Sequence, residues 1–164
     1  YCGATPQPNG WRDDWLEFYR DQRLGHLLRL AVDHRGVPGA ERRAFERLLT
    51  RLPEWLATDP EPPALIHGDL WAGNVHVAPD GAPGLIDPAV SYSHREAELG
   101  MMALFGGFGS RTWAAYEAAW PLQPGWRERL PLYTLFHVLN HYVLFGGPYG
   151  PQAWATVRRF VGAP

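Results

Sequence analysis

Hydrophobic residues recur at helical spacing over most of the chain, which predicts a largely α-helical protein. The first such stretch runs from Trp11 to about Leu30, and the second runs from Ala40 to Leu52, where Pro53 closes it. Four further helices are predicted at about 95–105, 110–119, 126–145 and 151–161. Within 126–145, Pro131 predicts a kink or a boundary because proline has no N–H to donate.

The middle of the chain has a different pattern, with three short apolar segments that are typical of strands. They lie at 64–66, 75–77 and 84–86. Asp80-Gly81 stands between the last two and favours a tight hairpin turn. The sequence therefore predicts an α+β fold, mostly helical, in which residues 1–164 form a single domain with one small β-hairpin.

The candidate chemistry is concentrated around this hairpin. The sequence His-Gly-Asp-Leu-Trp-Ala-Gly-Asn occupies 67–74, before the second strand, and Asp87 follows the third strand. Phosphoryl transfer to a hydroxyl requires a carboxylate that takes the proton and oxygen ligands that hold Mg²⁺ on the nucleotide phosphates. An Asp, an Asn five residues later and an Asp beyond a hairpin match the kinase arrangement. We therefore expect Asp69 to be the base, and Asn74 and Asp87 to bind Mg²⁺.

Other residues of the loop are predicted to support it. His67 is expected to hydrogen-bond within the loop, while Gly68 and Gly73 permit backbone angles that other residues disfavour. The alternative is that Asp69 and Asp87 only cap turns, as Asp often does. The joint pattern of strand, loop, hairpin and strand-borne Asp is more specific than any one residue, and it favours a catalytic site.

Several side chains outside this core set have two interpretations. Trp71 is placed to line an acceptor site, or it packs in the core. His94 and Glu96 open a helix beyond Asp87 and would shape the same pocket, or they form an ordinary helix N-terminus. His137 and His141 have a spacing that can bind zinc, but no third ligand is evident and a structural role is favoured.

The composition narrows the classes of function. The 164 residues are 46% hydrophobic and 20% charged with a net charge of −2, which predicts a folded protein with no nucleic-acid partner and no membrane association. No apolar run reaches the roughly 18 to 20 residues that span a bilayer. The single Cys2 forms no internal disulfide and fits a cytoplasmic location. All 15 basic residues are Arg, so the chain contains no Lys.

The motif at 67–74 and Asp-Pro-Ala at 87–89 resemble the fructosamine-kinase (ketoamine-kinase) family of the protein-kinase-like fold. The likeness extends over nearly the whole chain, including the segments 5–7, 11–23, 93–99, 104–108 and 133–147. It implies an ATP- and Mg²⁺-dependent enzyme of the EC 2.7.1 type that phosphorylates a sugar hydroxyl of ketoamines, a protein-deglycation activity. It also implies that Trp71, His94 and Glu96 contribute to the ketoamine pocket.

The chain departs from the family in one large respect. Family members carry an N-terminal lobe with a glycine-bearing loop and a Lys that grips ATP, and neither is present here. We therefore expect this chain to be the C-terminal catalytic lobe, inactive alone, and capable of self-association through the surface that the absent lobe would cover. Two alternatives stay open: an aminoglycoside- or choline-type phosphotransferase, and a non-catalytic module that binds sugar amines.

Overall fold

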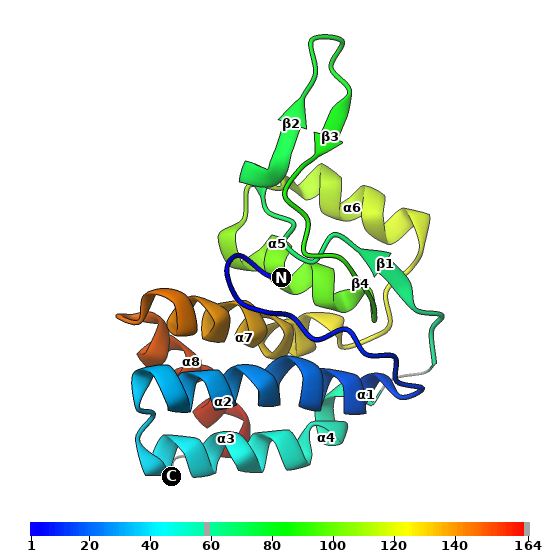
Figure 1. Cartoon of the computed structure of the whole chain (residues 1–164). Helices are drawn as coiled ribbons and strands as arrows, with labels where there is room; N and C mark the ends of the chain where they lie inside the picture. Colours follow the sequence, from blue (N-terminus) through cyan, green and yellow to red (C-terminus); the bar gives the residue numbers. More distant parts are fainter. Residues whose placement is uncertain (58–59, 163–164) are drawn as a thin grey trace. The chain divides into compact units, whose positions relative to one another are not determined.

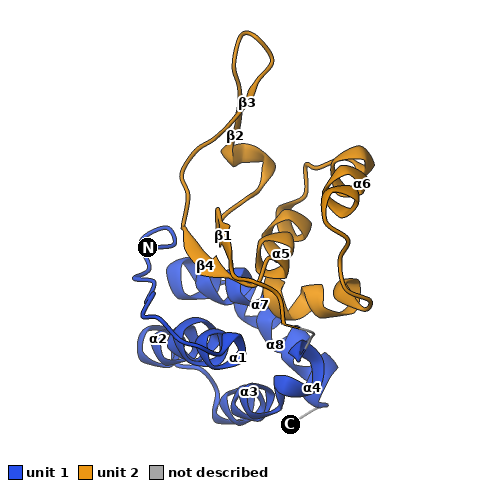
Figure 2. Cartoon of the chain, turned by 90° about the vertical axis from the view of Figure 1, so that its right-hand side faces the viewer, with its two compact units in different colours: residues 1–57, 135–164 blue, residues 58–134 orange. Residues whose placement is uncertain are grey.

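The chain divides into two compact units in a computed structural model that describes residues 1–57 and 60–162. Unit 1 combines Tyr1–Ala57 with Leu135–Pro164, and unit 2 is Thr58–Thr134 (Figure 2). The prediction of a mostly helical α+β protein with a small β-hairpin is confirmed, and the described residues contain a second antiparallel strand pair that was not predicted. The prediction of a single domain stays a prediction. None of the described helices combines the length and the apolar content that a bilayer-spanning segment needs.

The first helical run of unit 1 corresponds to the one that the sequence placed at Trp11–Leu30. The run has three parts: α1 (Trp15–Phe18), a π-helical segment η1 (Tyr19–Leu24) and α2 (Gly25–Arg35). It begins at Trp15 because the Asp14 carboxylate caps it, accepting a hydrogen bond from Glu17 N at 2.7 Å. It ends at Gly36, whose φ of 67° is the left-handed conformation common at helix ends.

The π-helical segment holds the extended N-terminal chain in place. Gln22 accepts a hydrogen bond from Gly10 N at 2.8 Å and donates one to Gly10 O at 2.6 Å. Arg23 donates to Pro8 O at 2.6 Å and to Asn9 Oδ1 at 2.7 Å. Burial lowers the pKa of Arg23 to about 10. These side chains satisfy backbone groups that no regular element pairs.

The rest of unit 1 is helical. Its elements are α3 (Gly39–Arg51), α4 (Pro53–Leu56), the later part of α7 (Trp126–Phe145) and α8 (Tyr149–Val161). Helix α3 packs on α8, where the rings of Phe45 and Trp154 meet edge to face at 6.2 Å. Pro53 not only closes α3 but opens α4, because the first turn of a helix does not need its N–H.

All the strands of the described residues lie in unit 2. Its elements are β1 (Ala64–Ile66), the 3₁₀ turn η2 (Ala72–Asn74), β2 (Val75–Val77), β3 (Pro83–Leu85), β4 (Ser91–Ser93), α5 (Glu96–Phe105), α6 (Ser110–Ala119) and the start of α7. The predicted third strand lies one residue earlier than expected. Helix α7 continues through Pro131, so the prediction of a boundary there is wrong.

The strands form two separate antiparallel pairs, β1 with β4 and β2 with β3. The β2–β3 hairpin extends away from the rest of unit 2 (Figure 1). Its turn follows the prediction: Gly81 has a φ of 85° and donates to Ala78 O at 2.8 Å, while Asp80 Oδ1 accepts from Ala82 N. The hairpin returns the chain to the loop from which it left.

The core of unit 2 is built on α5. Leu99 and Met102 are buried against Trp126 at the start of α7. Further side chains pack around them, namely Leu70, Phe108, Trp113, Tyr116, Leu122 and Leu130. Leu70 comes directly after Asp69, so the loop with the predicted base is anchored in this core.

Candidate active site

Asn74, the last residue of the 67–74 loop, is hydrogen-bonded to Asp69 near the start of the loop. Its side chain is buried, with only 7% of the residue exposed. The amide Nδ2 donates to Asp69 O at 2.9 Å and lies 3.4 Å from Asp69 Oδ2. One amide thus fixes the backbone of Asp69 and contacts its carboxylate. The two residues that sequence spacing assigned to base and metal ligand are in direct contact.

The segment that carries Asp87 is hydrogen-bonded to both ends of this loop. Ile86 N donates to Asn74 O at 3.0 Å, and Ala89 N donates to His67 O at 2.8 Å. His67 Nε2 lies 2.8 Å from Ile86 O, a second link at the same place. Asp87 is therefore held between two points of attachment, so all three predicted chemical residues belong to one locally bonded assembly.

The backbone of Asp87 is unusual. Its φ is 52°, and among the described residues it is the only one other than glycine with a positive φ. Such a conformation costs roughly 1 kcal/mol or more for most residues, although Asp tolerates it better than most. The sequence predicted that Asp87 follows a buried strand, and the strand is there but exposed. β3 ends at Leu85, and Asp87 is exposed in the bend that follows.

The two glycines of the loop act differently from each other. Gly68 has a φ of 80°, and a Cβ there would overlap the carbonyl oxygen of Ala89. Gly73 has no positive φ, but a Cβ on it would overlap the indole ring of Trp71. Trp71 thus lies across Gly73 with 39% of its surface exposed, and its ring centroid is 6.0 Å from that of Phe105.

Glu98 contacts the loop, although the sequence interpretation gave it no role there. Its carboxylate accepts hydrogen bonds from His67 N at 2.5 Å and from Gly68 N at 3.1 Å. The Leu70 N–H also interacts with it. Burial raises the pKa of Glu98, and the loop amides oppose that effect by stabilising the charged form. Glu98 is 30 residues from Gly68, so no local motif could have indicated the contact.

Two predicted pocket residues have other contacts. Glu96 is only 1% exposed, and its two carboxylate oxygens accept hydrogen bonds from Arg129 at 2.5 and 2.8 Å. His94 stacks parallel to Tyr133 with ring centroids 6.3 Å apart, and burial lowers its pKa. The ion pair gives Glu96 a structural role, since both its oxygens are already engaged. An acceptor contact for either residue stays a prediction.

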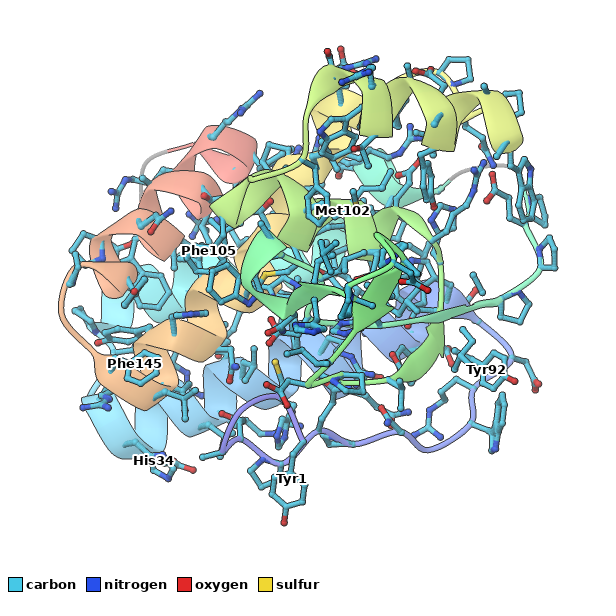
Figure 3. All side chains as sticks on the ribbon, turned by 90° about the horizontal axis from the view of Figure 1, so that it is seen from above. Tyr1, His34, Tyr92, Met102, Phe105 and Phe145 are labelled. Atoms are coloured by element: carbon cyan, nitrogen blue, oxygen red, sulfur yellow. The ribbon has the colours of Figure 1, made fainter. Side chains whose placement is uncertain are left out.

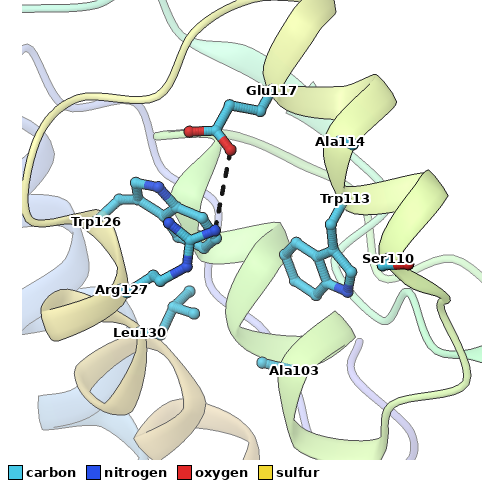
Figure 4. Close-up of a pocket in the computed structure, with 8 residues that line it drawn as sticks. All are labelled: Ala103, Ser110, Trp113, Ala114, Glu117, Trp126, Arg127 and Leu130. Atoms are coloured by element: carbon cyan, nitrogen blue, oxygen red, sulfur yellow. Dashed lines mark ion pairs between the residues drawn. The ribbon is translucent and has the colours of Figure 1, made fainter.

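A separate pocket of about 550 Å³ lies between α5, α6 and the start of α7 (Figure 4). The indoles of Trp113 and Trp126 stack in it at 5.9 Å, and the Arg127 guanidinium lies 4.1 Å from the Trp126 ring centroid. Glu117 and Arg127 form a long ion pair of 3.9 Å at its rim. None of the predicted site residues lines this pocket.

The donor set fits Mg²⁺ better than a softer metal. In the part of the chain that the structure describes, no three His, Cys, Asp or Glu side chains are grouped as a metal site. Asn74 and Asp87 offer oxygen donors alone. Mg²⁺ is commonly bound by one or two protein oxygens together with substrate phosphates and water. The predicted pair is of that kind.

Comparison with known proteins shows which family the chain matches. The family model for fructosamine kinase matches residues 1–162. A probable ketoamine kinase from Synechocystis is 44% identical over 165 residues, which is 96% of this chain and 52% of that protein. A chloroplastic protein-ribulosamine 3-kinase from Arabidopsis thaliana is 40% identical over 97% of this chain and 48% of that protein.

A solved crystal structure of a similar protein supports the same family. A candidate fructosamine-3-kinase from Thermobifida fusca has a TM-score of 0.88 and 45% identity, over 96% of this chain and 55% of that one. The chain spans about half the length of the curated relatives it matches.

Proposed function

The chain belongs to the fructosamine kinase family, and from that premise we propose that it is the carboxy-terminal, catalytic lobe of an ATP-dependent ketoamine kinase. The observation that carries the proposal is the bonding of Asp69, Asn74 and the Asp87 segment into one assembly. The relatives are named for ketoamine and ribulosamine substrates, so the acceptor class proposed here is a sugar amine formed by glycation.

Each residue has a defined task in the proposed reaction. The Asp69 carboxylate orients the acceptor hydroxyl and takes its proton as that oxygen bonds to the γ-phosphorus of ATP and ADP leaves. Asn74 and Asp87 supply oxygen ligands for Mg²⁺, which neutralises charge on the phosphates when bound. Trp71, an exposed residue of the loop, offers a flat face to the sugar. Asn74 also keeps Asp69 in position through its amide.

We also propose that residues 1–164 do not transfer phosphate unaided. Kinases of this general type use a Lys to hold the nucleotide phosphates, and the chain contains none. The lobe would then provide the base, the metal ligands and the acceptor pocket. The part of the relatives that this chain does not match would hold ATP. Part of the apolar surface of unit 2 would be left uncovered in the isolated chain, which favours self-association.

The test compares two proteins. One is residues 1–164, and the other is the same chain joined to the portion of the Synechocystis relative that it does not match. ATP-dependent phosphorylation of a fructosyl-amine is expected in the fusion alone, and Asp69→Asn in the fusion should lower kcat at least about 100-fold. Robust transfer by residues 1–164 would contradict the proposed inactivity.

Failure of the fusion points to other functions. Phosphorylation of an aminoglycoside or choline in place of the fructosyl-amine would identify a different acceptor class. Binding of the fructosyl-amine to residues 1–164 without turnover in either protein would identify a sugar-amine binding module, an interpretation that the absence of Lys favours.

A further inference from the structure

We propose that the pocket between α5, α6 and the start of α7 binds an aromatic α-amino acid. Its volume of about 550 Å³ is within the range of small-molecule sites. All the residues that line it belong to unit 2, and none of them has a role in the proposed phosphate transfer. The inference goes beyond the proposed function and does not depend on it.

The wall of the pocket is apolar and largely aromatic. The indoles of Trp113 and Trp126 stack with their ring centroids 5.9 Å apart and their planes at 19°. Ala103 and Ala114 are exposed and bring little bulk into the space, and Leu130 is half-buried beside them. Helix α6 has no buried residue, so it does not close the space against α5 and α7. A flat apolar side chain can therefore pack against aromatic partners here.

The rim of the pocket has one carboxylate and one guanidinium that are only loosely paired. Glu117 Oε2 and Arg127 Nη2 are 3.9 Å apart, whereas the other ion pairs of the described residues measure 2.5 to 2.8 Å. Within that part of the chain, neither side chain forms a hydrogen bond to another residue. An exposed pair of this length contributes little to stability, so a ligand can separate the two groups at small cost.

The two rim charges match the two charged groups of an α-amino acid. The ammonium group would bind Glu117, and the carboxylate would accept hydrogen bonds from Arg127, whose planar guanidinium can donate two in parallel. The Arg127 guanidinium lies 4.1 Å from the ring centroid of Trp126, which holds it beside the aromatic wall. The side chain of the ligand would then lie towards Trp113, inside the pocket shown in Figure 4. A ligand with a single charge would leave one rim group unmatched.

The test titrates residues 1–164 with L-phenylalanine and follows the indole N–H signals of the eight Trp residues by nuclear magnetic resonance. We expect the signals of Trp113 and Trp126 to shift with a Kd on the order of 1 mM, and the signal of Trp71 to stay in place. Phenethylamine lacks the carboxylate, and 3-phenylpropionate lacks the ammonium group. Each should bind at least about 5-fold more weakly than L-phenylalanine.

Variants separate the contribution of the rim from that of the wall. Glu117→Gln should weaken L-phenylalanine at least about 5-fold and leave 3-phenylpropionate unaffected, because only the ammonium group loses its partner. Glu128→Gln is the matched control, since Glu128 is an exposed acid of α7 that does not line the pocket, and it should bind as the wild type does. Ala103→Phe fills the pocket from α5 and should abolish binding of all three probes.

Three results would overturn the proposal. One is the absence of any shift of Trp113 and Trp126 at about 20 times the expected Kd, including the case in which only the Trp71 signal moves. Another is equal affinity for L-phenylalanine and phenethylamine, which would mean that the pocket selects apolar groups without recognising a carboxylate. The third is a shift of Trp113 and Trp126 with protein concentration that L-phenylalanine does not reverse, which would mean that a second copy of the chain occupies the pocket.

Discussion

Gly68 and Gly81 share a left-handed backbone but have different surroundings. Their φ values are 80° and 85°, yet a Cβ on Gly68 would overlap Ala89 O, whereas a Cβ on Gly81 would meet no atom within 4 Å. Substitution by Ala at Gly81 thus measures backbone strain alone, and the same substitution at Gly68 adds a steric clash between two segments of the site.

We expect Gly81→Ala to lower the free energy of unfolding by about 1 kcal/mol, the cost of the left-handed conformation. Gly68→Ala should lower it by about 2 to 4 kcal/mol, because the close approach of the 86–89 segment is also lost. Urea denaturation of both variants is the measurement. Equal destabilisation would mean that the Ala89 contact carries no energy.

Sequence reasoning reached the residues of the site that lie within a short motif. His67, Asp69 and Asn74 lie within eight consecutive residues and contact one another in the structure. Asp87 follows a hairpin whose turn the sequence also indicated. Glu98 was missed because its partners are backbone amides, which any sequence could supply. Gly73 was predicted to allow backbone angles that other residues disfavour, but its φ is not positive, and its missing side chain leaves space for the indole ring of Trp71.

Among the elements, the long helices were the most predictable. Apolar spacing located α5, α6 and α7 to within a residue, because each is at least ten residues long and its apolar residues recur at helical spacing. Strand β4 was not predicted. Its sequence, Ser-Tyr-Ser, has no apolar alternation, and it is a strand only because Ser91 and Ser93 pair with Ile66 and Ala64 of β1. Such a pairing is long-range and leaves no local signal.

Helix α7 also carries a titratable group that should make stability depend on pH. His137 is fully buried, and this burial, together with the nearby positive charge of Arg23 and the neighbouring His141, lowers its pKa from about 6.5 to about 3. Below pH 6.5 the unfolded chain gains a proton at this position that the folded protein does not. Its contribution to stability is therefore complete above pH 6.5 and is lost as the pH falls towards 3.

From pH 6.5 to pH 5 we expect this residue to remove about 2 kcal/mol from the free energy of unfolding. His137→Gln should remove that part of the pH dependence, whatever it does to stability at neutral pH. Urea unfolding curves at several pH values measure the slope. Equal slopes for the two proteins would show that His137 is protonated as readily in the folded state as in the unfolded chain.

For the whole molecule, the division into two units is a feature that no local pattern indicated. The boundary between Thr134 and Leu135 falls inside α7, a helix with continuous apolar spacing, and unit 1 is made from both ends of the chain. Compositional signs of a linker, such as a proline-rich loop, are absent from that point of the sequence. A reading along the chain therefore predicts one domain.

Exposed apolar residues give a further prediction for the isolated chain. Leu65 and Tyr92 are paired in register across β1 and β4 and are 63% and 51% exposed, and the Tyr92 side chain lies at the periphery in Figure 3. We expect residues 1–164 to self-associate, and the double variant Leu65→Ser, Tyr92→Ser to remain monomeric at higher concentration.

Light scattering coupled to size exclusion, over a range of protein concentrations, measures the association. Trp11→Ser is the control, because Trp11 is 76% exposed but belongs to unit 1. If the control and the double variant reduce association equally, the effect follows total exposed apolar area and not this pair.

Because Asp87 has a left-handed backbone, substitutions at this position should affect folding and phosphate transfer separately. Asn and Gly enter that conformation readily but carry no charge, while Glu has the charge and a side chain that favours the ordinary conformation. A saturation library at this position of the fusion would be tested twice, once for folding and once for phosphate transfer. We expect Asn and Gly to allow folding but not phosphate transfer, and Asp to allow both.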